Sequence, residues 1–122
     1  MIFSKNYDDI NSVYDFSEGI ISDVRWENNT NLLIDVYYFS DKPIGFKDKD
    51  ITVRFKNCFS ANFDYEKMMN SVQEFNIVNP HPEIEAFTII KNNSRINVTV
   101  TTNFSDTIKI SCESICIESK DC

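Results

Sequence analysis

Histidine, cysteine and closely spaced carboxylates are the side chains of this sequence that could carry chemistry. The single histidine, His81, lies between Pro80 and Pro82. A histidine that acts as a general base needs an orienting carboxylate and a nucleophile within hydrogen-bond reach. Glu83 and Glu85 follow closely in sequence, but no activated serine or cysteine motif accompanies them. The pattern therefore indicates an ordinary loop histidine.

The cysteines suggest a metal site at first sight. Cys112, Cys116 and Cys122 cluster near the end of the chain, and His81 or Cys58 could complete a ligand set. Residues four apart on a strand, however, lie about 13 Å apart, too far for a disulfide or a shared tetrahedral zinc ion. The two-residue gap typical of zinc knuckles is also missing. We expect no metal, with Cys122 an exposed free thiol.

Two carboxylate pairs remain as candidates for acid–base catalysis. Asp8 and Asp9 are adjacent, and adjacent helical residues do not face each other. Glu83 and Glu85 would share a strand face roughly 7 Å apart, a spacing compatible with glycoside hydrolysis, but acidic β-proteins commonly offer such a pair. No phosphate-binding loop or dinucleotide fingerprint is present. We expect neither enzymatic activity nor a cofactor.

Composition narrows the class of partner. The chain has 122 residues, a formal net charge of −7 and 42% hydrophobic residues, as expected for one globular domain, residues 1–122. An acidic surface repels nucleic acid and anionic membranes and attracts a cationic protein. The alternative is that this acidity only keeps the protein soluble. No secretory signal or long apolar run occurs at the start, so we expect a cytoplasmic location.

The elements that would position these side chains are mostly β-strands. Alternation of β-branched and polar residues, interrupted by Asn, Ser and Asp clusters, predicts an antiparallel strand order. The last three strands should form a meander with one apolar face. Its final strand changes phase near Glu113, which predicts a β-bulge there. The expected strands are 20–26, 32–39, 51–59, 84–90, 95–102 and 107–117.

Helical spacing is found in two segments. Residues 5–16 place Ile10, Val13 and Tyr14 on one stripe, and residues 62–76 carry a second apolar stripe behind Asp64. The predicted fold class is α+β, mainly β: an antiparallel six-stranded sheet, or a sandwich-like arrangement of the same strands, with one or two short helices.

Negative charge concentrates in two segments of the chain. Residues 1–23 and residues 64–90 each have a net charge of −4, and the remaining residues together carry +1. If both segments pack on one side of the sheet, they form an acidic face for a cationic partner. An exposed aromatic side chain would anchor such a complex. The predicted partner-binding residues are Asp8, Asp9, Asp15 and Glu18, with Tyr37 as the anchor.

The first half of the chain resembles a known class of small proteins. The order DFSEGIISDVRW (15–26), LLIDVYYF (32–39) and ITVRFKNC (51–58) is similar to a pattern in bacterial immunity proteins of polymorphic toxin systems. The resemblance implies a non-enzymatic cytoplasmic protein that binds and neutralises a toxin. It assigns no individual functional residue.

Two other hypotheses remain open. The first is a small-ligand-binding protein or a hydrolase with an apolar pocket between sheet and helix, lined by Met68, Met69 and Phe75. The second, compatible with either function, is a homodimer formed by edge-strand pairing.

Overall fold

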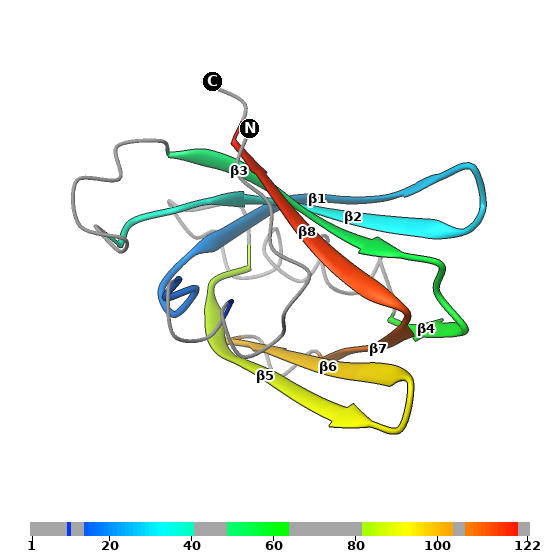
Figure 1. Cartoon of the computed structure of the whole chain (residues 1–122). Helices are drawn as coiled ribbons and strands as arrows, with labels where there is room; N and C mark the ends of the chain where they lie inside the picture. Colours follow the sequence, from blue (N-terminus) through cyan, green and yellow to red (C-terminus); the bar gives the residue numbers. More distant parts are fainter. Residues whose placement is uncertain (1–9, 11–13, 41–48, 64–81, 104–106, 120–122) are drawn as a thin grey trace.

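The computed structural model describes residues 10, 14–40, 49–63, 82–103 and 107–119. In this part of the chain, eight β-strands form two four-stranded antiparallel sheets (Figure 1). Sheet A has the strand order β1-β2-β3-β8, and sheet B has the order β4-β7-β6-β5. The bounds are β1 Ile20–Glu27, β2 Asn31–Tyr37, β3 Asp50–Lys56, β4 Ser60–Asn62, β5 Ile84–Asn92, β6 Arg95–Thr102, β7 Thr107–Cys112 and β8 Ser114–Ser119.

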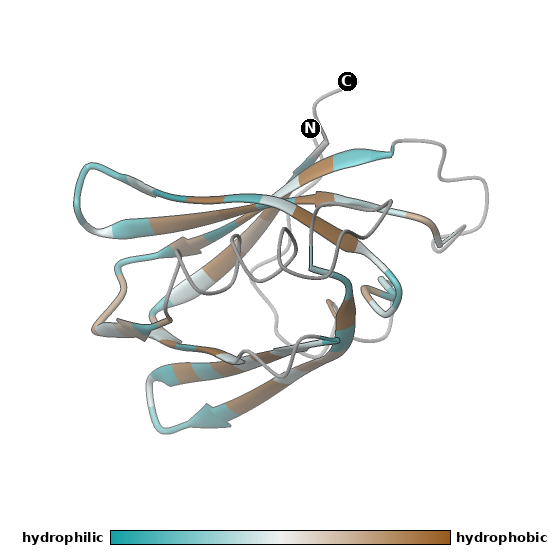
Figure 2. Ribbon diagram, turned by 180° about the vertical axis from the view of Figure 1, so that it is seen from behind, coloured by the Kyte–Doolittle hydropathy of each residue, from teal (hydrophilic) through white to brown (hydrophobic). Residues whose placement is uncertain are grey.

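The two sheets share one hydrophobic core. Inward residues of sheet A, such as Val53 and Ile117, belong to the same buried cluster as Val98 and Ile110 of sheet B. Figure 2 shows the hydrophobic segments along the strands and the hydrophilic ones at the hairpin turns. Aromatic rings connect the layers, because the Phe87 ring of β5 lies 4.6 Å from that of Phe16 and 6.4 Å from that of Phe55, measured between ring centroids.

The first hairpin is confirmed where the sequence placed it. Antiparallel pairing joins β1 to β2 from Ile20↔Tyr37 to Glu27↔Asn31. Its turn is made by Asn28 and Asn29, whose φ angles of 57° and 64° lie in the left-handed region. Asparagine adopts this region more readily than most residues, which explains the Asn-rich loop.

The final strand differs from its prediction. Residues 107–117 are not one bulged strand, because β7 belongs to sheet B and β8 to sheet A. The segment from β3 to β4 crosses between the sheets at the same corner, since β3 pairs with β8 and β4 pairs with β7. The phase change near Glu113 therefore marks a change of sheet, not a local bulge within a strand. For the same reason the predicted single six-stranded sheet is wrong, and the two-layer alternative describes the fold better.

An extra residue, as in a β-bulge, does occur at this corner, but it lies in the connection between β3 and β4 and not in the one between β7 and β8. Lys56 pairs with Ser114 and Ser60 pairs with Ser111. Three residues, 57–59, therefore lie opposite two, 112–113. An insertion of this kind increases twist and bends a strand pair from one sheet into another. Asn57 absorbs the turn with a φ of 52°.

A short seam of backbone pairing connects the sheets at a second place. Ile84 N donates to Gly19 O at 2.7 Å, and Glu18 N donates to Ile84 O at 2.9 Å. Ile20 and Glu83 form an antiparallel bridge. We call residues 18–21 and 82–84 the β1–β5 seam. A side chain at Gly19 would meet Phe16 O and Val36 at 2.9 Å, so this close approach requires glycine.

The predicted helices fall largely outside the described residues. Tyr14 N donates to Ile10 O at 2.9 Å, the spacing of an α-helical hydrogen bond, but residues 14–16 have no regular secondary structure, so the predicted helix does not extend to residue 16. Of the predicted helix 62–76, only positions 62 and 63 are described, and Asn62 ends strand β4. No helix within the described residues is long and apolar enough to cross a membrane.

The core makes a direct prediction for stability. Phe55 is fully buried, whereas Phe59, four residues later, is 51% exposed. Phe55→Ala should lower the free energy of unfolding by about 3–5 kcal/mol, because it leaves a cavity between the sheets. The matched control Phe59→Ala should cost about 1 kcal/mol or less, mainly through its contact with Arg95. Urea denaturation measures both, and equal losses would contradict the assignment of Phe55 to the shared core.

Candidate functional site

The outer face of sheet A carries a network of ion pairs. Strand alternation turns every second residue of β1, β2, β3 and β8 away from the core, and antiparallel register sets these residues side by side. One cross-strand row runs Asp23, Asp35, Thr52 and Glu118; the next runs Arg25, Leu33, Arg54 and Cys116. We call the following residues the charged face: Asp23, Arg25, Glu27, Asp35, Thr52, Arg54 and Glu118.

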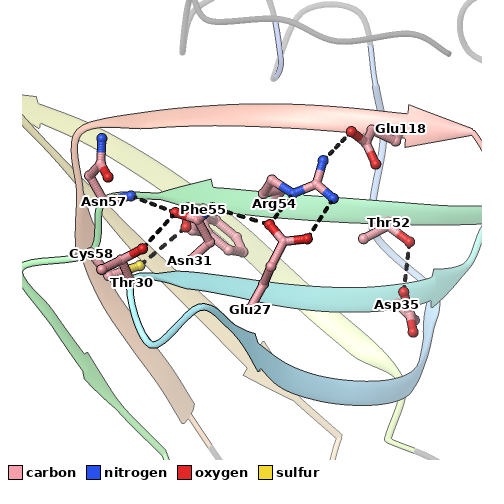
Figure 3. Close-up of polar contacts among 10 residues, drawn as sticks. All are labelled: Glu27, Thr30, Asn31, Asp35, Thr52, Arg54, Phe55, Asn57, Cys58 and Glu118. Carbon is pink, nitrogen blue, oxygen red and sulfur yellow. Dashed lines mark hydrogen bonds and ion pairs between the residues drawn. The ribbon is translucent and has the colours of Figure 1, made fainter.

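Arg54 lies at the centre of the charged face (Figure 3). Its Nε and Nη2 donate to the two carboxylate oxygens of Glu27 at 3.0 and 3.2 Å, and its Nη1 pairs with Glu118. Burial by itself would lower the pKa of Arg54, but hydrogen bonds to Glu27 and Glu118 outweigh it and raise that pKa. The guanidinium therefore connects β1, β3 and β8 as a fixed charge.

Asp35 is the buried acid of this face. Only 7% of the residue is exposed, and Thr52 Oγ1 donates to its Oδ1 at 2.7 Å. Arg25 pairs with its other oxygen and lies 3.9 Å from Asp23. A buried carboxylate needs such partners, because an unpaired one would cost several kcal/mol. These contacts indicate a structural role for Asp35 rather than a catalytic one.

Arg54 and Asp35 were not among the candidates from sequence. Strand alternation did place Arg54 and Thr52 on the outward face. Their partners are 17 to 64 residues away in the chain, and only the register of three strand pairs determines which carboxylate faces which guanidinium. The sequence signal for this network is the presence of charged residues at outward positions of the expected strands, and it does not show which of these residues pair.

The β1–β5 seam brings the two acidic segments together. Glu18 belongs to the first segment and Glu83 and Glu85 to the second, and backbone hydrogen bonds join them through Ile84. Glu18 and Glu85 are exposed, and Glu83 is partly exposed. Residues 14–24 and 82–90 contain no lysine or arginine. The described carboxylates of these two segments, which we call the acidic seam, are Asp15, Glu18, Asp23, Glu83 and Glu85.

The predicted partner-binding acids have different outcomes. Asp8 and Asp9 lie outside the described residues. Asp15 is exposed, and its Oδ1 accepts hydrogen bonds from the backbone N and the Oγ of Ser17, at 3.1 and 2.5 Å. Its own backbone N donates to the buried Tyr38 hydroxyl at 2.8 Å. Glu18 has a φ of 68°, held in place by the seam hydrogen bond.

Tyr37 lies at the surface, as predicted for an anchor. It is 41% exposed, and Phe39 beside it is 50% exposed. Their ring centroids are 4.9 Å apart in an edge-to-face arrangement. We call these two residues the aromatic pair. Tyr37 is directly opposite Ile20, which in turn bridges to Glu83. Tyr37 of the aromatic pair and Glu83 of the acidic seam therefore lie in one cross-strand row.

Other candidate sites carry less chemistry. Burial raises the pKa of the Cys112 thiol to about 12, with a further contribution from Cys58, and burial also raises the pKa of Cys58. Such thiols are poor nucleophiles at neutral pH. Cys112 and Cys116 lie on different sheets, and within the described ranges no three His, Cys, Asp or Glu residues are grouped to hold a metal ion. His81 lies outside these ranges.

Within the described residues, two hollows lie on the outer face of sheet B. One, of about 340 Å³, has a mixed polar and apolar lining that includes Ser60, Thr99 and Lys109. The other, of about 430 Å³, lies beside the β5–β6 turn. Neither resembles the apolar pocket of the ligand-binding hypothesis, whose expected lining residues fall outside the described part of the chain.

Comparison with known proteins relates this chain to others by fold alone. No protein-family model matches the sequence, and no curated protein matches it either. The structure is similar to the crystal structure of an uncharacterized protein from Neisseria gonorrhoeae, with a TM-score of 0.53 and 15% sequence identity, over 85% of this chain and 93% of the other. This similarity supports the mainly β architecture and assigns no family.

The charged face predicts a pH dependence of stability. Hydrogen bonds from Asn31 and Arg54 hold the pKa of Glu27 below its usual value of 4.5. A carboxylate with a lowered folded-state pKa stabilises the protein above its unfolded-state pKa, and this contribution disappears as the pH falls through the folded-state pKa. Glu27→Gln should therefore lose less stability than the wild type between pH 6 and about pH 3.5.

Urea denaturation at several pH values measures this difference. Glu113→Gln is the control, because Glu113 is exposed and, among the described residues, its carboxylate accepts one hydrogen bond, from Asn57 Nδ2 at 3.3 Å. Identical pH profiles for the wild type and Glu27→Gln would contradict the assignment of Glu27 to the ion-pair network.

Proposed function

We propose that this protein is a non-enzymatic binding module that attaches to a cationic protein through the acidic seam and the aromatic pair. The observation that carries the proposal is the pairing of two acidic segments, remote in sequence, at the β1–β5 seam. Their five described carboxylates are exposed or partly exposed, and no cationic residue lies within either stretch.

The backbone beneath these charges is fixed by hydrogen bonds. Glu83 N donates to the Asn103 side chain at 3.0 Å, and Asn103 N donates back to Glu83 O at 3.0 Å. Together with the seam bonds, these contacts hold Glu18 and Glu83 in fixed relative positions. A charge pattern fixed before binding avoids the entropy cost of ordering it in the complex, and complementary charge increases the association rate.

The aromatic pair would supply the short-range part of the binding energy. Tyrosine is enriched among residues that dominate interfaces, because it combines a large apolar ring with a hydroxyl. The edge-to-face contact with Phe39 orients the Tyr37 ring, and the backbone of Tyr37 lies opposite Ile20, which bridges to Glu83. Charges would then steer the partner, and the rings would slow its dissociation.

The partner class we favour is a toxin neutralised in the cytoplasm of the producing cell. The resemblance of residues 15–58 to immunity proteins supports this choice, and so does the acidic surface, because toxins that act on nucleic acid are themselves cationic. The charged face of sheet A remains a structural network in this proposal, since its guanidinium groups are already paired.

The test is a binding measurement with a purified partner. Cross-linking and mass spectrometry in cells of the source organism would identify the partner, and biolayer interferometry would give its rate constants. The double substitution Glu18→Gln/Glu83→Gln should lower the association rate roughly tenfold at low salt. The difference should disappear as added salt screens the charges.

Two controls make this experiment decisive. Glu113→Gln removes one exposed carboxylate at the corner between β7 and β8, so it should leave the rate nearly unchanged. Tyr37→Ala should raise the dissociation rate by about tenfold or more, whereas Phe59→Ala should not. Binding that is insensitive to salt and to the Glu18→Gln/Glu83→Gln change would exclude the acidic seam as the binding surface.

A further inference from the structure

The two hollows on the outer face of sheet B differ in charge from the molecule as a whole. The chain has a formal net charge of −7, but Arg95 lines one hollow and Lys109 lines the other. None of the described residues that line either hollow is an aspartate or a glutamate. The ion pairs of the described residues engage Arg25 and Arg54, whereas Arg95 and Lys109 are exposed. An acidic protein therefore presents two cations to solvent on this face.

The register of β6 and β7 joins the two hollows into one surface. Asn97 and Ser111 are directly opposite each other, and both line both hollows. The next outward pair along these strands is Thr99 and Lys109. Arg95 precedes Asn97 by two residues in β6, so it lies on the same face of the strand. We call Arg95, Asn97, Thr99, Lys109 and Ser111 the sheet B site.

An aromatic contact positions the guanidinium group of Arg95. Its Cζ lies 4.3 Å from the centroid of the Phe59 ring. The Phe59 backbone is held against β7, because its N donates to Ser111 O at 2.7 Å. A guanidinium that lies over a ring keeps the N–H groups of its edge available, and these bind a carboxylate, sulfate or phosphate in a bidentate manner. The contact therefore orients Arg95 for an acidic group before the ligand arrives.

Neutral polar groups lie between the two cations. The amide of Asn97 and the hydroxyls of Thr99 and Ser111 each offer a donor and an acceptor, and directly opposite residues of adjacent strands lie about 5 Å apart. Sugar hydroxyls are likewise donors and acceptors, so neighbouring hydroxyls of a sugar match such a pair. The hollows have volumes of about 430 and 340 Å³, within the range of roughly 300–1,000 Å³ for small-molecule sites.

We infer that the sheet B site binds an oligosaccharide that carries acidic groups, either carboxylates or sulfates. Arg95 binds one acidic group and Lys109 a second, and the side chains of Asn97 and Ser111 hydrogen-bond to the hydroxyls between them. Arg95 lies four residues along β6 from Thr99, the residue opposite Lys109, a backbone distance of about 13 Å. A ligand that uses both cations is therefore extended, as an oligosaccharide is.

Other anionic ligands match this surface less well. A nucleic acid is repelled by the net charge of −7, and base stacking needs an open aromatic face, whereas the Arg95 guanidinium lies over the Phe59 ring. An acidic peptide would need apolar anchor points, and the five residues of the sheet B site are polar or charged. The carboxylate of Glu113, which follows β7, accepts a hydrogen bond from Asn57 at 3.3 Å, and Glu113 is not among the described lining residues.

Isothermal titration calorimetry with the full chain tests this inference. The probes are trigalacturonate and a chondroitin sulfate tetrasaccharide, and methyl-esterified trigalacturonate is the uncharged counterpart. At least one acidic probe should bind at low salt with a dissociation constant below about 1 mM, and the methyl ester should bind at least tenfold more weakly than trigalacturonate if trigalacturonate is that probe. Arg95→Gln and Lys109→Gln should each lower the affinity roughly tenfold, and Phe59→Ala should lower it a few-fold, because Arg95 loses its support.

Matched controls separate a saccharide site from a general anion surface. Lys49→Gln removes one positive charge just before β3 in sheet A, so it should leave the affinity nearly unchanged. Sodium sulfate, a hexaglutamate peptide and an octathymidylate should bind more weakly than the acidic saccharide. The inference is overturned if neither acidic saccharide binds at about 1 mM or if one of the three comparison anions binds as tightly. Wild-type affinity in Arg95→Gln and Lys109→Gln proteins that are folded by circular dichroism would also overturn it. These measurements do not involve the acidic seam, so their outcome is independent of the proposed partner binding.

Discussion

The structure depends on one corner, where the connection between β3 and β4 (residues 57–59) lies opposite the connection between β7 and β8 (residues 112–113) and both segments pass from one sheet to the other. At this point β3 leaves sheet A to become β4, and β8 follows β7 in the opposite sense. Three residues opposite two force the bend, and Asn57 accepts the left-handed conformation that it requires. Because the same corner sets the register of β3 with β8 and of β4 with β7, it fixes which side chains meet in the core and which ions meet on the charged face.

The seam between β1 and β5 complements this corner. It contains few hydrogen bonds, yet it joins segments more than 60 residues apart in the chain. Its functional consequence is electrostatic, since it combines two separate acidic stretches into one surface. The ion pairs around Arg54, in contrast, are satisfied within sheet A. The carboxylates of Glu27, Asp35 and Glu118 therefore form ion pairs that stabilise the fold. Those of Glu18, Glu83 and Glu85 lie at the surface, exposed or partly exposed.

Much of the strand content was predictable because alternation is local. Five expected strands correspond to β1, β2, β3, β5 and β6, with ends that differ by a few residues, and the expected meander exists as β5, β6 and β7. The three-residue strand β4 was missed, because Ser60–Asn62 offers too few residues to show a period. The phase change near Glu113 is visible in the sequence, but the sequence does not show its cause, since a bulge and a change of sheet alter the alternation in the same way.

The sequence by itself determined the acidity, the β-rich composition, the hairpin turn at Asn28 and Asn29, and the outward position of Tyr37, because each depends on neighbouring residues or on composition. Tertiary structure decided how the strands divide between two sheets, which carboxylate meets Arg54, and that Glu18 lies beside Glu83. These are pairings between remote segments, and their selection depends on how all inward side chains fill one shared core. The structure of residues 107–117 was decided in the same way. Their sequence predicts one continuous strand, but the core divides them into β7 of sheet B and β8 of sheet A.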